Sequence, residues 1–335
     1  MKRILSGVRP TGTIHLGNYL GAIKQWVDGL DNQQGRGEDN LFCIVDLHAL
    51  TTLENSEILK HNSYLMAATY LACGLSPRKC HIFRQSDIPA HSELAWIFSC
   101  MTPMGWLNRM TQFKEKAVHK AIDSVCLGLY AYPVLMAADI LIYKATHVPV
   151  GDDQKQHVEL ARDIAGMFNR RFQRDYFTLP EPVITGPATR IMSLRDGTAK
   201  MSKSDTSDYS RIHLTDDAET IAKKIRKAKT DSDVIASSME AMEHRLEARN
   251  LIHILAALTS QKPDAVCKTF TGKNFSHLKN ALIDELHMHI LPIGEKIKHY
   301  MEGQTYLHHI IKEGAEYANA LASKHIKEIK EIVGL

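Results

Sequence analysis

The sequence predicts an α/β fold, with a doubly wound parallel sheet followed by an all-helical C-terminal domain. Short apolar runs at 41–45, 81–85 and 148–150 alternate with helical patterns, which is the order found in parallel sheets. Polar or small residues follow these runs, where open α/β sheets bind their ligands. No strand pattern is clear after about residue 200, so we expect domains at 1–205 and 206–335, with the last helices able to pack back on the first domain.

The first eighteen residues predict a phosphate site. Lys2–Ser6 reads as a strand, and the helix pattern of Leu16, Leu20 and Ile23 follows it. Three glycines lie between them, and glycine backbone and a helix N-terminus both suit an anion. The stretch has neither the dinucleotide glycine fingerprint nor a P-loop. His15 at the mouth of the helix could donate to a phosphate oxygen that gains charge. The alternative is an ordinary turn with a surface histidine.

A second polar stretch carries two lysines three residues apart, Lys200 and Lys203, flanked by hydroxyl side chains. Lysine supplies compact positive charge for phosphate oxygens. Alone, such a run is usually a solvated loop. Together with the turn at His15, at the other end of a long α/β segment, it favours a site for a polyphosphate.

One carboxylate, Asp139, lies inside the apolar run 127–145. A carboxylate in apolar surroundings is costly unless it is paired, so we expect Asp139 to contact a ligand at a pocket floor. The alternative is a helix residue that faces solvent. Another strand, 148–150, runs into Gly151, Asp152 and Asp153, whose backbone and carboxylates suit a ribose.

The composition and the apolar pattern argue against a membrane-spanning or a secreted protein. The chain has 335 residues, and 41 basic against 38 acidic residues give a net charge of +3, which does not by itself indicate a nucleic-acid binder. No apolar run is long enough for a bilayer, and the N-terminus lacks an apolar signal core, so we expect a cytoplasmic protein without a membrane. Six scattered cysteines predict reduced thiols, and we expect no fixed metal site.

A basic helix is expected at 218–229, where Asp216 and Glu219 suggest a capping box. Its buried stripe would be Ile221, Ile225 and Ala228. Its other face is either solvated or a contact for RNA phosphates. The basic residues are Lys223, Lys224, Arg226, Lys227 and Lys229.

Two of these stretches resemble the signature sequences of class I aminoacyl-tRNA synthetases. The first, normally His-Ile-Gly-His, reads His-Leu-Gly-Asn at 15–18, and the second, Lys-Met-Ser-Lys-Ser at 200–204, is intact. The runs YPVLMAADIL at 132–141 and VPVGDDQKQHVELARDIAGMFN at 148–169 resemble the bacterial tryptophanyl branch of that family. The resemblance covers essentially the whole chain, and tyrosyl enzymes share the signatures but not these two runs.

The resemblance implies a Rossmann-like catalytic domain that forms tryptophanyl-adenylate and pyrophosphate from ATP and L-tryptophan. Tryptophan would then pass to the 3′ end of tRNA(Trp). It also implies a helical anticodon-binding domain at 206–335, a homodimer, and Mg²⁺ that is carried by ATP and not by a fixed protein site.

The resemblance further implies roles for individual residues. Asp139 would accept the indole N–H, and Tyr132 and Gln154 would hold the ammonium group. Position 9 is Arg where many relatives have Gln, and Leu5 replaces an aromatic residue of some relatives. The catalytic set is His15, Asn18, Lys114, Lys200 and Lys203. The ATP set is Arg9, Pro10, Thr11, Gly17, Asn18, Gly151, Asp152, Asp153, Ile191, Lys200, Met201, Ser202, Lys203 and Ser204. The tryptophan set is Asp139, Tyr132, Met136, Gln154, Val150, Leu5 and His48.

Three alternatives stay open. A tyrosyl-type enzyme is opposed by the surroundings of Asp139. A small-molecule nucleotidyltransferase is opposed by the intact lysine loop and the helical domain. A synthetase-derived RNA-binding or regulatory protein would be marked by decayed signatures, and both signatures are present.

Overall fold

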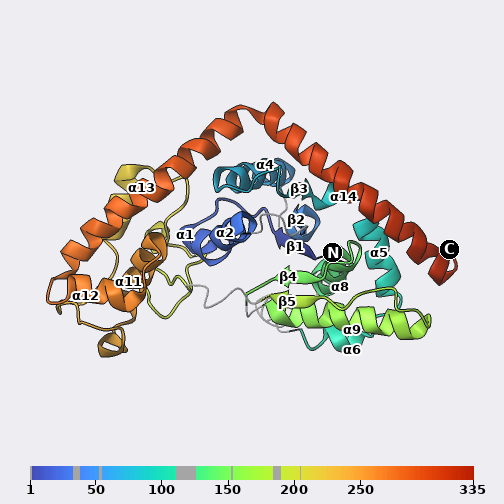
Figure 1. Ribbon diagram of the computed structural model, residues 1–335, viewed down its shortest axis with the longest axis horizontal. Coiled ribbons are helices and arrows are strands. Elements are labelled where there is room, and N and C mark those ends of the chain that lie inside the picture. The colour runs from blue at the N-terminus through green and yellow to red at the C-terminus, as the bar shows by residue number, and fades with distance from the viewer. Residues whose placement is uncertain are drawn as a thin grey trace.

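The computed structural model describes residues 2–32, 38–52, 55–110, 126–151, 154–183, 190–203 and 205–335. Within them lies a five-stranded parallel sheet of order β3-β2-β1-β4-β5, which confirms the predicted fold class (Figure 1). The strands are β1 (Arg3–Val8), β2 (Asp39–Ile44), β3 (His81–Arg84), β4 (His147–Pro149) and β5 (Glu181–Val183). The sequence pattern missed β5 because this edge strand begins with Glu181 and Pro182 and so contains no apolar run.

Helices connect the strands and then form the C-terminal part alone. The first set is α1 (Leu16–Asn18), a π-helical turn (Tyr19–Ile23), α2 (Lys24–Asn32), α3 (Asp46–Ala49), α4 (Ser56–Ala72), α5 (Ala90–Ser99), α6 (Met104–Leu107), α8 (Leu127–Leu141) and α9 (Lys155–Arg171). The second set is α10 (Ala218–Arg226), α11 (Leu246–Thr259), α12 (Pro263–Phe270), α13 (Phe275–Glu302) and α14 (Gln304–Val333). Helix α13 continues through Pro292.

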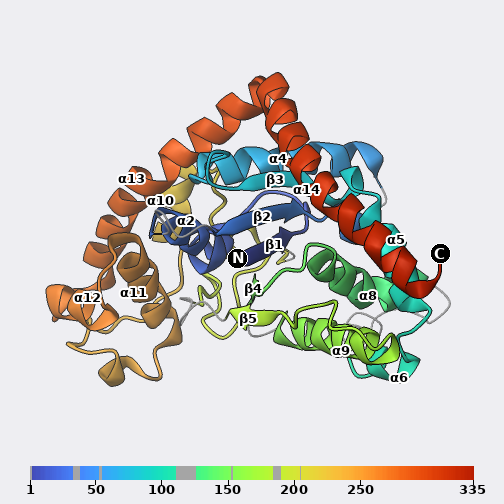
Figure 2. The same ribbon diagram turned by 45° about the vertical axis from the view of Figure 1, so that its right-hand side comes forward.

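Two apolar cores cover the two faces of the sheet. Side chains alternate along β2, so Phe42 and Ile44 point into one core and Leu41 and Cys43 into the other. The first core continues from α2 and α4 into α11 and α13, and the second is built with α5, α8 and α9. Figures 1 and 2 show α11 and α12 far from α5, α8 and α9, with the sheet between them.

The last two helices form an inverted V over the molecule, joined at Gly303 (Figure 1). Helix α14 packs against the open edge of β3, where a Cβ on Gly314 would lie 2.1 Å from the carbonyl oxygen of Ile82. Backbone therefore meets backbone, and the helix protects an edge that could pair with another strand. The division at residue 205 stays a prediction.

The start of α10 differs from the expected capping box. Asp217, one residue later than expected, caps the helix by accepting from the Thr220 N–H at 2.8 Å. Asp216 instead accepts from the ammonium group of Lys224 at 2.7 Å. Lys224 is buried, so the prediction that it lies on a solvated basic face is wrong.

The order of the strands fixes the place of the site. β1 lies between β2 and β4, so the chain winds in opposite directions on its two sides. Ligands of such sheets bind at the carboxyl ends of the strands beside this switch point. The loop after β1, α3 after β2, and the residues after β4 all begin there. Across the described ranges, no helix has the length and apolarity needed to cross a membrane.

Candidate active site

The turn after β1 holds His15 in a fixed orientation. Gly12 has a φ of +102°, and His15 then caps α1, where its Nδ1 accepts from the Asn18 N–H at 3.3 Å. Burial, followed by the nearby charge of Lys203, lowers the pKa of His15 to about 3. The ring is therefore neutral near pH 7, and because Nδ1 accepts, its proton lies on Nε2. His15 can act as a neutral hydrogen-bond donor.

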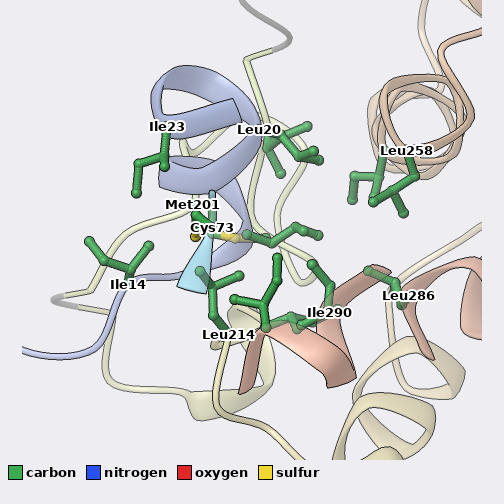
Figure 3. Close-up of a cluster of buried hydrophobic side chains, with 14 of the residues drawn as sticks. Ile14, Leu20, Ile23, Cys73, Met201, Leu214, Leu258, Leu286 and Ile290 are labelled. Atoms are coloured by element: carbon green, nitrogen blue, oxygen red, sulfur yellow. The ribbon is translucent and has the colours of Figure 1, made fainter. Parts of the chain in front are cut away.

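The lysine loop packs directly on this turn. Met201 is buried, and Figure 3 shows it in the same cluster as Ile14, Leu20 and Leu214. A Cβ on Gly17 would lie 3.2 Å from the His15 ring and 3.4 Å from the Met201 Cβ, so glycine allows the close approach. The two signature stretches therefore lie side by side.

Lys203 connects the lysine loop to the turn after β1 by a hydrogen bond. Its ammonium group donates to the carbonyl oxygen of Gly12 at 3.0 Å. Burial, and next the positive charge of Arg9, lower the pKa of Lys203 to about 8. The Arg9 side chain thus acts on a lysine of the signature loop.

The chain after the lysine loop joins the two signatures a second time. Leu16 N–H donates to the Ile212 carbonyl at 2.8 Å, and Leu214 N–H donates to the Ile14 carbonyl at 3.0 Å. Arg211 donates to the Asp205 carbonyl at 2.9 Å, just beyond the loop. The position of the loop is therefore fixed from its outgoing end.

Asp139 lies on α8 at the centre of a buried hydrogen-bond network. Its Oδ1 accepts from Gln85 Nε2 and from His91 Nδ1, both at 2.6 Å, and its Oδ2 accepts from His48 Nε2 at 2.7 Å. The Tyr143 hydroxyl lies 2.7 Å from the other nitrogen of His91. Burial would raise the pKa of Asp139, but the charge and hydrogen bonds of His48, and then of His91, outweigh it and hold the pKa below its usual range.

Of the expected tryptophan set, His48 contacts Asp139 and Tyr132 contacts His48, while other members lie in the core on the α8 side of the sheet. The Tyr132 hydroxyl lies 2.9 Å from His157 Nε2, and the Tyr132 ring meets the His48 ring edge-on at 6.2 Å. Leu5 is buried in the same core, against which Met136 and Val150 also pack. Gln154 immediately precedes α9, and its N–H donates to the carbonyl oxygen of Gly151 at 2.9 Å.

The expected ATP set is only partly described. Ile191 accepts from Met201 N–H at 3.1 Å, and Pro10 is buried while Arg9 and Thr11 are partly exposed. Asn18 and Ser202 are half-buried, whereas Gly151 and Lys200 are exposed. Four expected residues lie outside the described ranges: Lys114, Asp152, Asp153 and Ser204.

Three polar residues of the site were missed from the sequence: Gln85, His91 and His157. Gln85 directly follows β3, so the rule that polar residues gather at strand ends could have found it. His91 and His157 lie within helices and meet their partners only through the fold, so no local signal marks them.

The chain was compared with known families and structures. The model of the family "tRNA synthetases class I (W and Y)" matches residues 1–288. The chain belongs to this family. It is therefore an enzyme of the class I aminoacyl-tRNA synthetases, as the resemblance of the two signatures implied.

Individual relatives agree with this assignment. Tryptophan--tRNA ligase of Brucella melitensis is 47% identical over 350 residues, which cover 99% of this chain and 97% of that protein. The tryptophanyl-tRNA synthetase of Campylobacter jejuni, solved with ADP and tryptophan, is 34% identical with a TM-score of 0.84, over 99% of this chain and 100% of that one. The corresponding Mycoplasma pneumoniae structure is 33% identical with a TM-score of 0.88, over 100% and 98% of the two chains.

Proposed function

We propose that this enzyme activates L-tryptophan with ATP and transfers it to tRNA(Trp). The observation that carries the proposal is the Asp139 carboxylate, buried on α8 at the centre of a hydrogen-bond network with Gln85, His91 and His48. A carboxylate offers about four acceptor positions. Three are used by Gln85, His91 and His48, and the one left on Oδ2 can accept the indole N–H.

The surroundings of Asp139 suit an indole ring. Leu5, Met136 and Val150, which belong to or pack against the core on the α8 side of the sheet, would give apolar walls, and the hydrogen bonds of Asp139 are in place before the substrate arrives. A substrate without an N–H or O–H at that position would leave the buried carboxylate short of a donor. Sites of this kind discriminate by about 10⁴–10⁵-fold, so phenylalanine would be rejected without editing. Tyr132 and Gln154 would bind the ammonium group.

The first step needs no nucleophile from the protein. The tryptophan carboxylate attacks the α-phosphorus, the bond to the bridging oxygen breaks, and pyrophosphate leaves with the negative charge. His15 donates from Nε2, while Lys200 and Lys203 offset the charge of the leaving group. Lys114, Asp152, Asp153 and Ser204 keep their expected roles within the proposal.

Mg²⁺ would bind to the triphosphate. Among the described residues, no group of three or more His, Cys, Asp or Glu side chains is placed to hold a metal ion. Phosphate oxygens are hard ligands that Mg²⁺ prefers, and the ion commonly keeps several waters. The charge that it supplies when bound adds to that of Lys200 and Lys203. In the second step the ribose hydroxyl of tRNA attacks the adenylate carbonyl and AMP leaves.

The helical part, residues 206–335, would bind tRNA and read the anticodon. Lys223 on α10 and Lys227 at its C-cap are exposed and give positive charge, and the Lys227 ammonium lies 4.5 Å from the centre of the Tyr209 ring. Cations and an aromatic face together suit an RNA backbone. Because the proposed substrate is tRNA, the proposed compartment is the cytoplasm.

The exposed apolar side chains support a homodimer. Trp96 on α5, Met104 on α6 and Leu127 at the start of α8 are 72%, 69% and 78% exposed, and α8 packs against both other helices. Exposed apolar patches mark interfaces, and we propose that these three side chains contribute to one. Light scattering should give the mass of two chains, and Trp96→Glu should give the mass of one.

Charging of tRNA(Trp) tests the proposed function as a whole. The purified chain, ATP, Mg²⁺ and labelled tryptophan should give labelled tRNA that loses its label at alkaline pH, as an ester does. Failure to charge tRNA(Trp), with an unrelated tRNA as the negative control, would contradict the proposal.

A further inference from the structure

The lysine loop is one strand of a small hairpin. Ser193 N–H donates to the Ala199 carbonyl at 2.8 Å, Met201 N–H donates to the Ile191 carbonyl at 3.1 Å, and Met192 lies opposite Lys200. The ladder uses the backbone groups of the residues on either side of Met192. The N–H and C=O of Met192 itself therefore point away from the lysine strand.

A side chain of the helical part occupies that outer edge. Asn250 on α11 is only 2% exposed, and its Oδ1 accepts from Met192 N–H at 2.9 Å. Its Nδ2 donates to the Met192 carbonyl at 2.9 Å and to the Ser193 carbonyl at 3.4 Å. The amide therefore takes the place of a third strand, since it supplies one acceptor and one donor to one residue.

The turn of the hairpin rests on the same helix. A Cβ on Gly197 would lie 2.7 Å from the backbone of Leu246 and Glu247, which begin α11. Glu247 also forms an ion pair with Lys229 at 2.6 Å. One helix thus contacts the hairpin at its turn and at its outer strand.

We infer that Asn250 is a positioning residue for amino-acid activation, acting through the Met192 backbone on the lysine loop. The inference rests on the proposed function. With Met192 held, Lys200 lies opposite it in the hairpin, and Lys203 donates to the Gly12 carbonyl in the turn before His15. The same bonds hold the backbone at Ile191, where the adenosine end of ATP is expected. A displacement of about 1 Å at a reacting group can cost about 10²-fold in rate.

The proposed role of Asn250 needs both the acceptor and the donor of its side-chain amide. Asn250→Ala removes the acceptor and the donor. Asn250→Asp keeps the shape and the acceptor, but places a carboxylate against the carbonyl oxygens of Met192 and Ser193. Both variants should therefore be impaired in amino-acid activation. If Asn250→Ala does not fold, Asn250→Asp alone tests the role of the side chain.

The test is tryptophan-dependent ATP–pyrophosphate exchange with the ATP concentration varied, with rates corrected by active-site titration. We expect kcat/KM for ATP to fall at least about tenfold in both variants. The Kd of tryptophan alone, measured by calorimetry, should stay within about twofold, because Asn250 contacts the hairpin and not the Asp139 pocket.

Two matched controls separate positioning from stability. Ile254→Val shortens a fully buried side chain of α11, so it should lower Tm while kcat/KM for ATP stays unchanged. Asn169→Ala on α9 removes an amide that also bonds backbone, at Tyr176 and Phe177, so it should lower Tm while kcat/KM for ATP stays unchanged.

The outcomes distinguish the inference from the proposed function. If both Asn250 variants lower Tm but keep kcat/KM for ATP within twofold of the wild type, the inference is wrong while the proposed function stands. If the wild type itself shows no exchange with tryptophan, the proposed function and the inference fall together.

Discussion

The site has an amino-acid half around Asp139 and a phosphate half around His15, Lys200 and Lys203. The two halves differ in how completely their charges are matched within the protein. Asp139 has three donors within the protein, and they hold its pKa below the usual range. On the other side Lys203 and Arg9 repel one another, and the pKa of Lys203 is lowered to about 8. Among the described residues, no ion pair includes Arg9, Lys200 or Lys203. The amino-acid half is thus complete before substrate binds, whereas the phosphate half lacks negative charge that ATP supplies.

The largest expected effect is on the phosphate half. Lys203→Met removes a cation beside the leaving group, so we expect kcat for tryptophan-dependent exchange to fall by about 10²–10³-fold. The Kd of tryptophan alone should not change. Lys312→Met, at an exposed lysine of α14, is the control and should retain full activity. A fall of less than threefold in Lys203→Met would remove Lys203 from the mechanism.

The next effect belongs to the amino-acid half. Asp139→Asn replaces a carboxylate, which only accepts, by an amide whose NH2 would face the donors of the network. A hydrogen bond to a charged group contributes about 1.5–3 kcal/mol. We expect kcat/KM for tryptophan to fall about 10- to 100-fold, with preference over tyrosine reduced and KM for ATP little changed. Asp163→Asn on the exposed side of α9 is the control. Unchanged tryptophan preference would show that the role given to Asp139 is wrong.

A smaller effect tests whether the amino-acid half is rigid because of its network. Tyr143→Phe removes the hydroxyl beside the buried His91 Nε2, and an unsatisfied buried group costs about 1–3 kcal/mol. Urea unfolding should show that loss of stability, and the Kd of tryptophan should rise less than in Asp139→Asn. Tyr306→Phe, at an exposed tyrosine, should change neither quantity. Equal losses of stability in Tyr143→Phe and Tyr306→Phe would show that the contact between Tyr143 and His91 does not stabilise the protein.

The smallest effect is a shift in pH dependence. Lys203 is charged below its pKa of about 8, so kcat/KM for ATP should fall as the pH rises through that value. Arg9→Gln removes one repelling charge, so the fall of kcat/KM for ATP should occur at higher pH. Burial is the larger cause of the lowered pKa, so the shift should be only part of the way toward 10.5. A shift to lower pH would contradict the coupling between Arg9 and Lys203.

The same difference explains what could be predicted from the sequence. The phosphate half consists of local stretches, the turn at His15 and the loop at Lys200, so their residue patterns were enough to find them. Asp139 was found because a lone carboxylate stands out in an apolar run. Its partner His91 could not be found, because the contact arises only when α5 packs on α8.

Long-range pairing also explains the other differences. The order of strand and helix patterns predicted the parallel sheet, but β5 contains no apolar run by which it could be recognised. Lys224 looked like part of a basic surface, yet it is buried between Asp208 and Asp216 at 2.9 and 2.7 Å. Nothing in the helical period of α10 distinguishes Lys224 from its exposed neighbour Lys223, since both acids lie outside the helix.

The most direct measurement is ATP–pyrophosphate exchange by the wild type, with tryptophan and tyrosine supplied separately. Exchange with tryptophan alone is the predicted result, because the proposal gives the remaining acceptor position of Asp139 Oδ2 to the indole N–H. Exchange with tyrosine in place of tryptophan would keep the fold and contradict the pocket. No exchange with either amino acid, by folded protein that still binds tRNA, would contradict the account and favour a regulatory RNA-binding protein.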